Sequence, residues 1–365
     1  MLELSDDRGV ISVLTAIVGS VVLLASAAMA IDVATLYSER RQLQNGADAA
    51  AIAVAQSCAR GLANAAAPCD IGPASALANG NALDHRSRVA LICGTAPGLA
   101  DCPAAGGSRA SCPAPAAGSP PYVEVHVRTG TADGADVVSP VFVRVLPGFQ
   151  DYPGTTVGAC ARAGYGAPAT ALSVLPITVS QCVVNQYRTE HGTFAPSTLA
   201  DAAPSQLRHW ETAIELHQDS GPCATSSSGL TAPGNFGYLE TATCAVETTA
   251  GASVPGDTGS SNPKTLGCTD SYLSSRLGEV VYLPVFDTVT GSGDSTRYHL
   301  VGYAALIFTG WQLSGTSHVS IATGAAPCGP PVTCISGAFV YGLQPTPGPI
   351  SSAPSYGATA VQLLG

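Results

Sequence analysis

The stretch VISVLTAIVGSVVLLASAAMAI, from Val10 to Ile31, decides the fold because none of its 22 residues carries a charge. As a helix it would be about 33 Å long at ~1.5 Å per residue, which is enough to cross the hydrocarbon core of a bilayer. Arg8 and Gly9 precede this stretch, and Asp32 ends it. The sequence therefore predicts a cytoplasmic N-terminus over residues 1–9 and a transmembrane helix over residues 10–31.

The helical pattern continues beyond the predicted span. Residues 32–55, DVATLYSERRQLQNGADAAAIAVA, contain no proline and place apolar side chains near one stripe, namely Leu36, Leu43, Ala47, Ala50 and Val54. We expect one long helix, half in lipid and half outside. The small side chains of Ala47 and Ala50 would let it approach a sheet or another helix closely.

A cleaved signal peptide is the alternative interpretation of the same stretch. Ala28-Met29-Ala30 has the small-x-small pattern of a cleavage site, and cleavage near Ala30 would release a secreted or surface binding module. The aromatic residues Phe236 and Tyr238 would be candidates for its ligand contacts. However, the uncharged stretch exceeds the ~7–15 residues of a typical signal peptide, and acidic residues outnumber basic ones before it. The sequence favours a retained anchor.

Cysteine content indicates an oxidising compartment. The chain has 12 cysteines, an even number that suits disulfides. Zinc binding is the competing explanation, but it usually needs close pairs such as C-x-x-C, and the chain has none. The disulfide candidates divide equally between the two halves of the chain: Cys58, Cys69, Cys93, Cys102, Cys112 and Cys160, then Cys182, Cys223, Cys244, Cys268, Cys328 and Cys334. Each half has enough cysteines for three bridges, in any of 15 connectivities.

The two signals for membrane orientation disagree. Arg40 and Arg41 follow the span, so the positive-inside rule would place the C-terminal side in the cytoplasm. The cysteines favour the opposite orientation. Because large domains translocate largely regardless of charge, we expect a single-pass cell-membrane protein with a cytoplasmic N-terminus and extracytoplasmic C-terminal domains.

Charge and motifs exclude several classes of function. The formal net charge is -10, and Lys264 is the single lysine, so no basic stripe suits nucleic acid. The sequence contains no H-E-x-x-H, G-x-S-x-G, Walker A or dinucleotide-binding pattern. We therefore predict no catalytic residues, no metal and no cofactor, and a protein that is not an enzyme.

The ordered pattern of the N-terminal segment resembles a known family. RGVISVL opens the span at Arg8, AIDV closes it at Ala30, and LY, RR, LQN and ADAAA follow at Leu36, Arg40, Leu43 and Ala47. This string is similar to that of TadG-like members of the TadE/TadG family, which is associated with assembly of Flp (tight adherence) pili. The resemblance implies a membrane-anchored structural or accessory component of a Tad-type pilus or a related cell-surface apparatus. Its implied partners are the membrane and other pilus-assembly or pseudopilin proteins, bound through the N-terminal helix.

One position departs from the pattern of true pilins. A prepilin cut after Gly9 would carry an acidic residue at the fifth position of the mature chain, which is Leu14 here. That carboxylate would pair with a neighbour's amino terminus in lipid. The sequence therefore favours an accessory component over a main pilus subunit.

An α+β fold is predicted after the anchor. Residues 32–168 would form a pilin-like unit in which the long helix packs on an antiparallel sheet, with a Cys-rich insertion over 58–121. Residues 122–128, 141–145 and 155–163 are its predicted strands, and His126 lies on the charged, solvated side of the first strand.

Residues 169–343 would form a second, Cys-rich and mostly β extracytoplasmic domain. Its predicted strands are 172–179, 279–287, 298–308 and 334–341, and a helix is expected over 205–217. Residues 344–365 are rich in Pro, Gly, Ser and Ala, which predicts a flexible tail.

Overall fold

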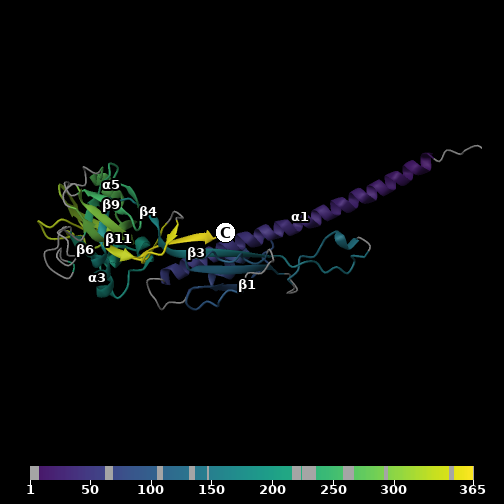
Figure 1. Cartoon of the computed structure of the whole chain (residues 1–365), viewed down its shortest axis with the longest axis horizontal. Coiled ribbons are helices and arrows are strands. Elements are labelled where there is room, and N and C mark those ends of the chain that lie inside the picture. Colours follow the sequence, from purple (N-terminus) through teal and green to yellow (C-terminus); the bar gives the residue numbers. More distant parts are fainter. Residues whose placement is uncertain are drawn as a thin grey trace, which may run out of the picture.

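A computed structural model gives the arrangement of the chain (Figure 1). It describes residues 8–61, 69–104, 110–130, 136–145, 148–215, 223, 236–257, 267–291, 295–344 and 349–364. Two sheets of six and eight strands organise this part of the chain, and a small pair, β4 (Thr170–Ser173) with β8 (Val246–Thr249), lies outside them. The fold is α+β, as predicted.

A single helix, α1 (Arg8–Gly61), runs for 54 residues and confirms the predicted continuity. Its side chains from Ile11 to Ile31 are almost all exposed, whereas Leu43, Ala47, Ala50 and Val54 are completely buried. Figure 1 shows the N-terminal part of α1 extending well away from both sheets. The first part of α1 is therefore apolar and exposed, whereas its second part belongs to a protein core.

The first sheet packs against the second part of α1. Its strands are β1 (Ser87–Gly94), β2 (Tyr122–Thr129), β3 (Gly158–Pro168), β16 (Ala358–Leu364) and β14 (Gly342–Leu343) in spatial order, with β15 (Ile350–Ser351) paired to β3. Neighbours from β1 to β16 are antiparallel. Helix α2 (Pro73–Gly80) also lies on α1, and a Cβ at Gly46 would come 3.0 Å from the carbonyl oxygen of Ala78. Glycine at position 46 therefore permits this close helix contact.

The second sheet closes on itself. Pairing runs β10–β5–β7–β9–β11, and β11 pairs again with β10. The strands of the ring are β5 (Ile177–Ser180), β7 (Phe236–Leu239), β9 (Ser253–Asp257), β10 (Val280–Thr290) and β11 (Arg297–Leu313). Strands β13 (Cys334–Val340), β6 (Thr212–Glu215) and β12 (Thr316–His318) extend it, and the helices beside it are α3 (Gln181–His191), η2 (Ser197–Asp201), α4 (Pro204–Leu207) and α5 (Asp270–Ser275). This unit is mostly β, as predicted.

Aromatic side chains fill the interior of the second sheet. Phe308 and Trp311 stack with their ring centroids 5.7 Å apart, and both are completely or almost completely buried. A Cβ at Gly237 or Gly256 would lie within 2.5 Å of the ring of Tyr298. The two glycines therefore make room for this ring.

All 12 cysteines form disulfides, and each half of the chain closes three bridges of its own. The pairs are Cys58–Cys69, Cys93–Cys102 and Cys112–Cys160, then Cys182–Cys223, Cys244–Cys268 and Cys328–Cys334. The expectation of disulfides is confirmed.

Two predictions for the first unit need correction. Residues 141–145 are not a strand: they contain the 3₁₀ turn η1 (Val143–Val145), because the backbone N–H groups of residues 141–143 bond to Asp32 on α1 and that of Val145 bonds to the carbonyl oxygen of Phe142. Strand β1 lies within the Cys-rich insertion of residues 58–121, for which no strand was predicted. The strand predicted over 122–128 is present as β2, and that predicted over 155–163 begins later, as β3.

The helix predicted over 205–217 is also wrong. Only Pro204–Leu207 is helical, and Thr212–Glu215 forms β6, which pairs with β13. Pairing with the edge of an existing sheet has overridden the helical spacing of Leu207, Trp210 and Ile214. His217 lies outside the described residues.

The flexible tail predicted over 344–365 is contradicted by β16. Five residues of β16, Ala360–Leu364, pair with β3, and Ala358 and Ala360 are buried. Alternation of buried small residues was present in the sequence, but its partner strand lies nearly 200 residues earlier. The C-terminal segment is therefore part of the first sheet.

Removing residues 358–365 tests the contribution of β16. We expect a lower thermal unfolding midpoint, by on the order of 5–10 °C, because strand pairing and buried surface are lost together. Differential scanning calorimetry of the detergent-solubilised chain measures it, with the exposed Gln362→Ala substitution as control. An unchanged midpoint in the truncated chain would contradict the assignment.

Candidate functional site

Asp32 joins α1 to the first unit at the end of the uncharged stretch. Its Oδ1 accepts the backbone N–H of Val141 at 2.8 Å, and its Oδ2 accepts those of Phe142 at 3.1 Å and Val143 at 2.7 Å. The carboxylate is 7% exposed. Three consecutive backbone donors surround one carboxylate, so Asp32 fixes the start of η1 against the helix.

The hydrogen bonds keep Asp32 ionised. Burial alone raises the pKa of its carboxyl group, but the three backbone N–H groups outweigh that effect and lower the pKa below the ordinary aspartate value. A carboxylate with a lowered pKa stabilises the folded state above the ordinary value, and this contribution is lost as the pH falls through the lowered one. The junction is therefore stable at neutral pH and weakens only in acid.

The segment held by Asp32 lies along the membrane-proximal part of α1. A groove between the two is lined by Met29, Asp32 and Leu36 on the helix and by residues that include Pro140 and Tyr152 on the segment. Met29 belongs to the uncharged stretch. The segment around η1 therefore reaches past Asp32 to the last turn of the predicted span.

A seam of small side chains attaches the second part of α1 to the sheet. Ala47, Ala50, Ala51 and Ala55 are completely buried against the apolar side of β2 and β3. Polar contacts border the seam: Gln44 donates to the carbonyl oxygen of Cys160 at 3.1 Å, and the hydroxyl of Thr129 donates to Glu39. Ala47 and Ala50, singled out in the sequence for helix packing, both lie in this buried cluster.

A charged cluster lies on the other side of the same sheet. Arg162 on β3 donates to Glu124 on β2 from Nε at 2.8 Å, and its Nη2 also donates to the carbonyl oxygen of Pro113 at 2.6 Å. Glu124 and Arg162 are each 4% exposed. This side was expected to be solvated, but the Cys-rich segment covers it. The cluster fastens that segment to the sheet, since removing one member of a buried ion pair would leave the other uncompensated.

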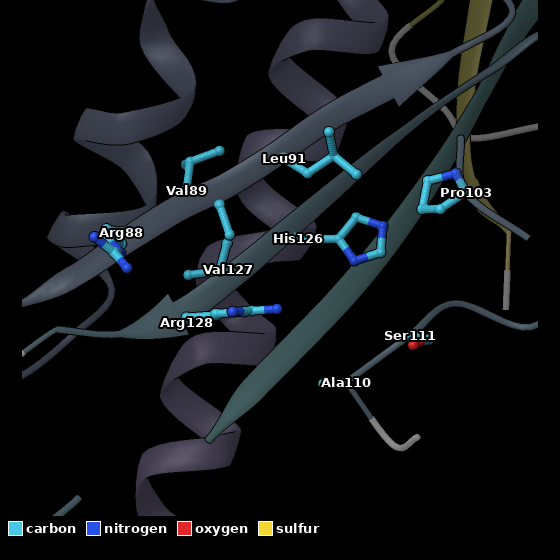
Figure 2. Close-up of a pocket in the computed structure, with 10 residues that line it drawn as sticks. Arg88, Val89, Leu91, Pro103, Ala110, Ser111, His126, Val127 and Arg128 are labelled. Carbon is cyan, nitrogen blue, oxygen red and sulfur yellow. The ribbon is translucent and has the colours of Figure 1, made fainter. Parts of the chain in front are cut away.

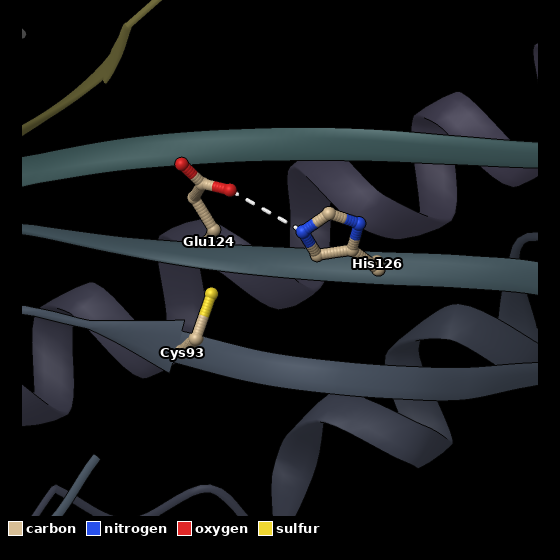
Figure 3. Close-up of side chains that lie close together, drawn as sticks. All are labelled: Cys93, Glu124 and His126. Atoms are coloured by element: carbon tan, nitrogen blue, oxygen red, sulfur yellow. Dashed lines mark hydrogen bonds and ion pairs between the residues drawn. The ribbon is translucent and has the colours of Figure 1, made fainter. Parts of the chain in front are cut away.

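His126 lies beside this cluster and is half-buried. Its Nε2 is 3.3 Å from Glu124 Oε2, and Cys93 completes a group whose ligand atoms lie within 4.8 Å of one another (Figure 3). A second such group contains Cys112, Glu124 and Cys160. All three cysteines are in disulfides, whereas a metal ligand requires the thiolate. Neither group is a complete metal site in the oxidised protein.

A shallow pocket opens next to His126. Figure 2 shows Arg88, Arg128 and His126 around it, with Val89 and Leu91 from the neighbouring strand. Arg88 forms an ion pair with Asp136. The sequence analysis predicted the Cys-rich insertion but neither this pocket nor the contact of the insertion with the sheet, because the residues that meet there come from separate parts of the chain.

The predicted site residues therefore occupy different places. Arg8 and Gly9 start α1, Asp32 lies at the junction, and Ala47 and Ala50 lie in the seam. They do not form one cluster. The partners of Asp32 were not predictable, because Val141 lies 109 residues further along the chain.

The Asp32→Asn substitution tests the junction. It removes the charge and replaces one acceptor oxygen with an amide group, so we expect amide hydrogen exchange at residues 141–143 to be about tenfold faster at pH 7. Asp151→Asn, in the same segment but exposed, is the matched control. In the unsubstituted protein the protection of these amides should fall, relative to the intrinsic exchange rate, only below the ordinary aspartate pKa. Equal exchange in Asp32→Asn and the control would contradict this role.

Ala50→Leu tests the seam. Three added carbon atoms at a completely buried position should lower the free energy of unfolding by about 1–3 kcal/mol through overpacking. Chemical denaturation in detergent measures the change. Asn45→Leu introduces the same side chain at an exposed position of the same helix and should have a much smaller effect. A loss in Asn45→Leu as large as that in Ala50→Leu would argue against close packing.

Comparison with known protein families finds a match to the N-terminal stretch that contains Asp32 and the seam. Residues 9–57 match the family model described as putative Flp pilus-assembly TadE/G-like. No curated protein and no solved structure matches the chain. The match covers the exposed apolar part of α1, Asp32 and the seam, and it supports involvement in Flp pilus assembly in general. The N-terminal segment of the chain, residues 9–57, is therefore TadE/TadG-like.

Proposed function

We propose that this protein is a membrane-anchored accessory component of Tad (Flp-type) pilus assembly or a related cell-surface apparatus. The observation that carries the proposal is the division of α1, whose exposed apolar part and buried part lie within the segment that matches the family. The helix is long and apolar enough to cross a membrane. Its role is structural: the anchor positions the folded units at the membrane surface.

The proposed orientation places the N-terminus in the cytoplasm and both folded units outside. Six disulfides support it, because all of their cysteines follow the predicted span and disulfides persist in oxidising compartments. Arg40 and Arg41 favour the opposite orientation, but they precede a large folded region, for which the charge rule is weak.

Partners are proposed to bind along the exposed part of α1. Residues 11–31 present apolar side chains all round the helix, and small residues such as Gly19, Ala27 and Ala28 permit close approach of a second helix in lipid. Leu14 supplies no carboxylate for the contact that a main pilin subunit would make. These features support an accessory position beside other pilus-assembly or pseudopilin proteins.

The alternative function, a binding module released by cleavage near Ala30, has less support. Tyr238 is 3% exposed inside the second sheet, so its ring is not available at the surface for a ligand. The side chain of Phe236 lies outside the described residues. Cleavage near Ala30 would leave Asp32 and the seam intact, and the mass of the mature chain distinguishes the two forms.

Gene deletion and replacement of the span test the proposal. We expect deletion to abolish surface pili and adhesion, counted by electron microscopy and by attachment to glass, and the full chain to restore both. A chain whose residues 10–31 are replaced by an unrelated Leu/Ala span should reach the membrane without restoring pili. Full restoration by this chain would contradict partner binding through α1, and wild-type piliation of the deletion strain would contradict the function.

A C-terminal alkaline phosphatase fusion tests the orientation. The enzyme needs disulfides to be active, so the fusion should be active and fractionate with the membrane. A matched fusion to the chain without residues 10–31 should be inactive. An inactive full-length fusion in the membrane fraction would overturn the orientation, and an active fusion released into the medium would favour the binding module.

A further inference from the structure

We propose that residues 140–145 and 148–152, here called the interfacial segment, form a second membrane contact of this protein. They would insert apolar side chains into the boundary between headgroups and acyl chains of the bilayer that α1 crosses. The proposal rests on the membrane anchoring proposed above. It adds a lipid-binding surface to a part of the chain outside the family match.

The interfacial segment exposes an unusual concentration of large apolar side chains. Val145 is 79% exposed, Val141 61% and Phe149 50%, and Phe142 and Tyr152 are each about two-fifths exposed. Single exposed apolar side chains are ordinary, but five within one short segment suit a contact site. Because both valines are held outward by a fixed backbone, their exposure is a property of the fold.

Asp32 sets the depth of the segment. It is the first charged residue after 22 uncharged ones, so it lies where the span ends, and it binds the backbone of residues 141–143 directly. The groove between helix and segment includes Met29, one turn inside the span. In Figure 1 the blue-green loop that precedes β3 extends from the sheet toward the N-terminal part of α1. The apolar side chains are therefore at the level of the membrane surface.

The residue types and the net charge of the interfacial segment favour lipid as its partner over another protein. Tyr152 is typical of the membrane interface, where Tyr places its ring in apolar surroundings and its hydroxyl in water. Phe149 is typical of the apolar face of segments that lie in the interface. Arg144 and Asp151 are the charged residues of the segment, and they balance each other. The Arg144 Nε donates to the carbonyl oxygen of Tyr152 at 3.0 Å, which braces the two sides of the loop. A neutral, apolar segment held against the end of a membrane span suits insertion into the same bilayer.

Depth-dependent fluorescence quenching tests this contact. The full-length Phe149→Trp protein would be reconstituted into vesicles of phosphatidylcholine and phosphatidylglycerol that contain lipids brominated at defined acyl positions. Emission of the unsubstituted protein, from Trp210 and Trp311, is subtracted. Leu24→Trp, within the span, reports on anchoring, and Leu83→Trp is the aqueous control. Leu83 is 84% exposed and donates its N–H to Gln42, about 15 Å along α1 beyond Asp32.

The expected result is strong quenching of Leu24→Trp, at least twofold quenching of Phe149→Trp by shallow bromines with a blue-shifted emission, and little quenching of Leu83→Trp. Quenching of Leu24→Trp without quenching of Phe149→Trp overturns the lipid contact and leaves the anchor intact. That outcome would leave the apolar surface for a protein partner. Absence of quenching in both variants overturns the anchor and the lipid contact together.

Discussion

The continuity of α1 across Asp32 is the constraint on which the rest of the structure depends. Because α1 is one unbroken helix, the position of its exposed apolar part fixes the position of the sheet that packs on its buried part. The seam of Ala47, Ala50, Ala51 and Ala55 uses this rigidity, because small side chains bring the helix axis close to the sheet. Polar contacts at Gln44 and Glu39 then determine its register on the sheet.

The two sides of the first sheet are stabilised in different ways. Toward α1, Val123, Val125 and Val127 bury apolar surface on an alanine-rich helix. On the opposite side, Glu124 and Arg162 are buried beneath a segment held by two disulfides. A buried ion pair adds little net stability, but it disfavours arrangements that would separate its members. The disulfides and the ion pair together determine how the covering segment is placed on this side.

Elements with a local cause were predictable from the sequence. The uncharged stretch and the absence of proline are sufficient for α1, and strict alternation is sufficient for β2. The failures share a non-local cause. Residues 141–145 alternate like a strand, yet the carboxylate of Asp32 takes their N–H groups. Thr212–Glu215 has helical spacing but pairs with β13, and Ala358–Leu364 looks like a tail until β3 supplies its partner. The number of disulfides could be predicted from the cysteine count, but which cysteines pair could not.

The return of the chain to β3 has a consequence for how such proteins can vary. Because β14, β15 and β16 follow the second sheet and pair within the first, the chain between β3 and β14 is, in topological terms, an insertion into a helix-and-sheet scaffold. Both connections to the scaffold lie on the same sheet. A chain built in this way can exchange or lose the inserted unit without altering the order of the scaffold's strands, so the inserted unit is free to diverge while the scaffold that packs on α1 is retained.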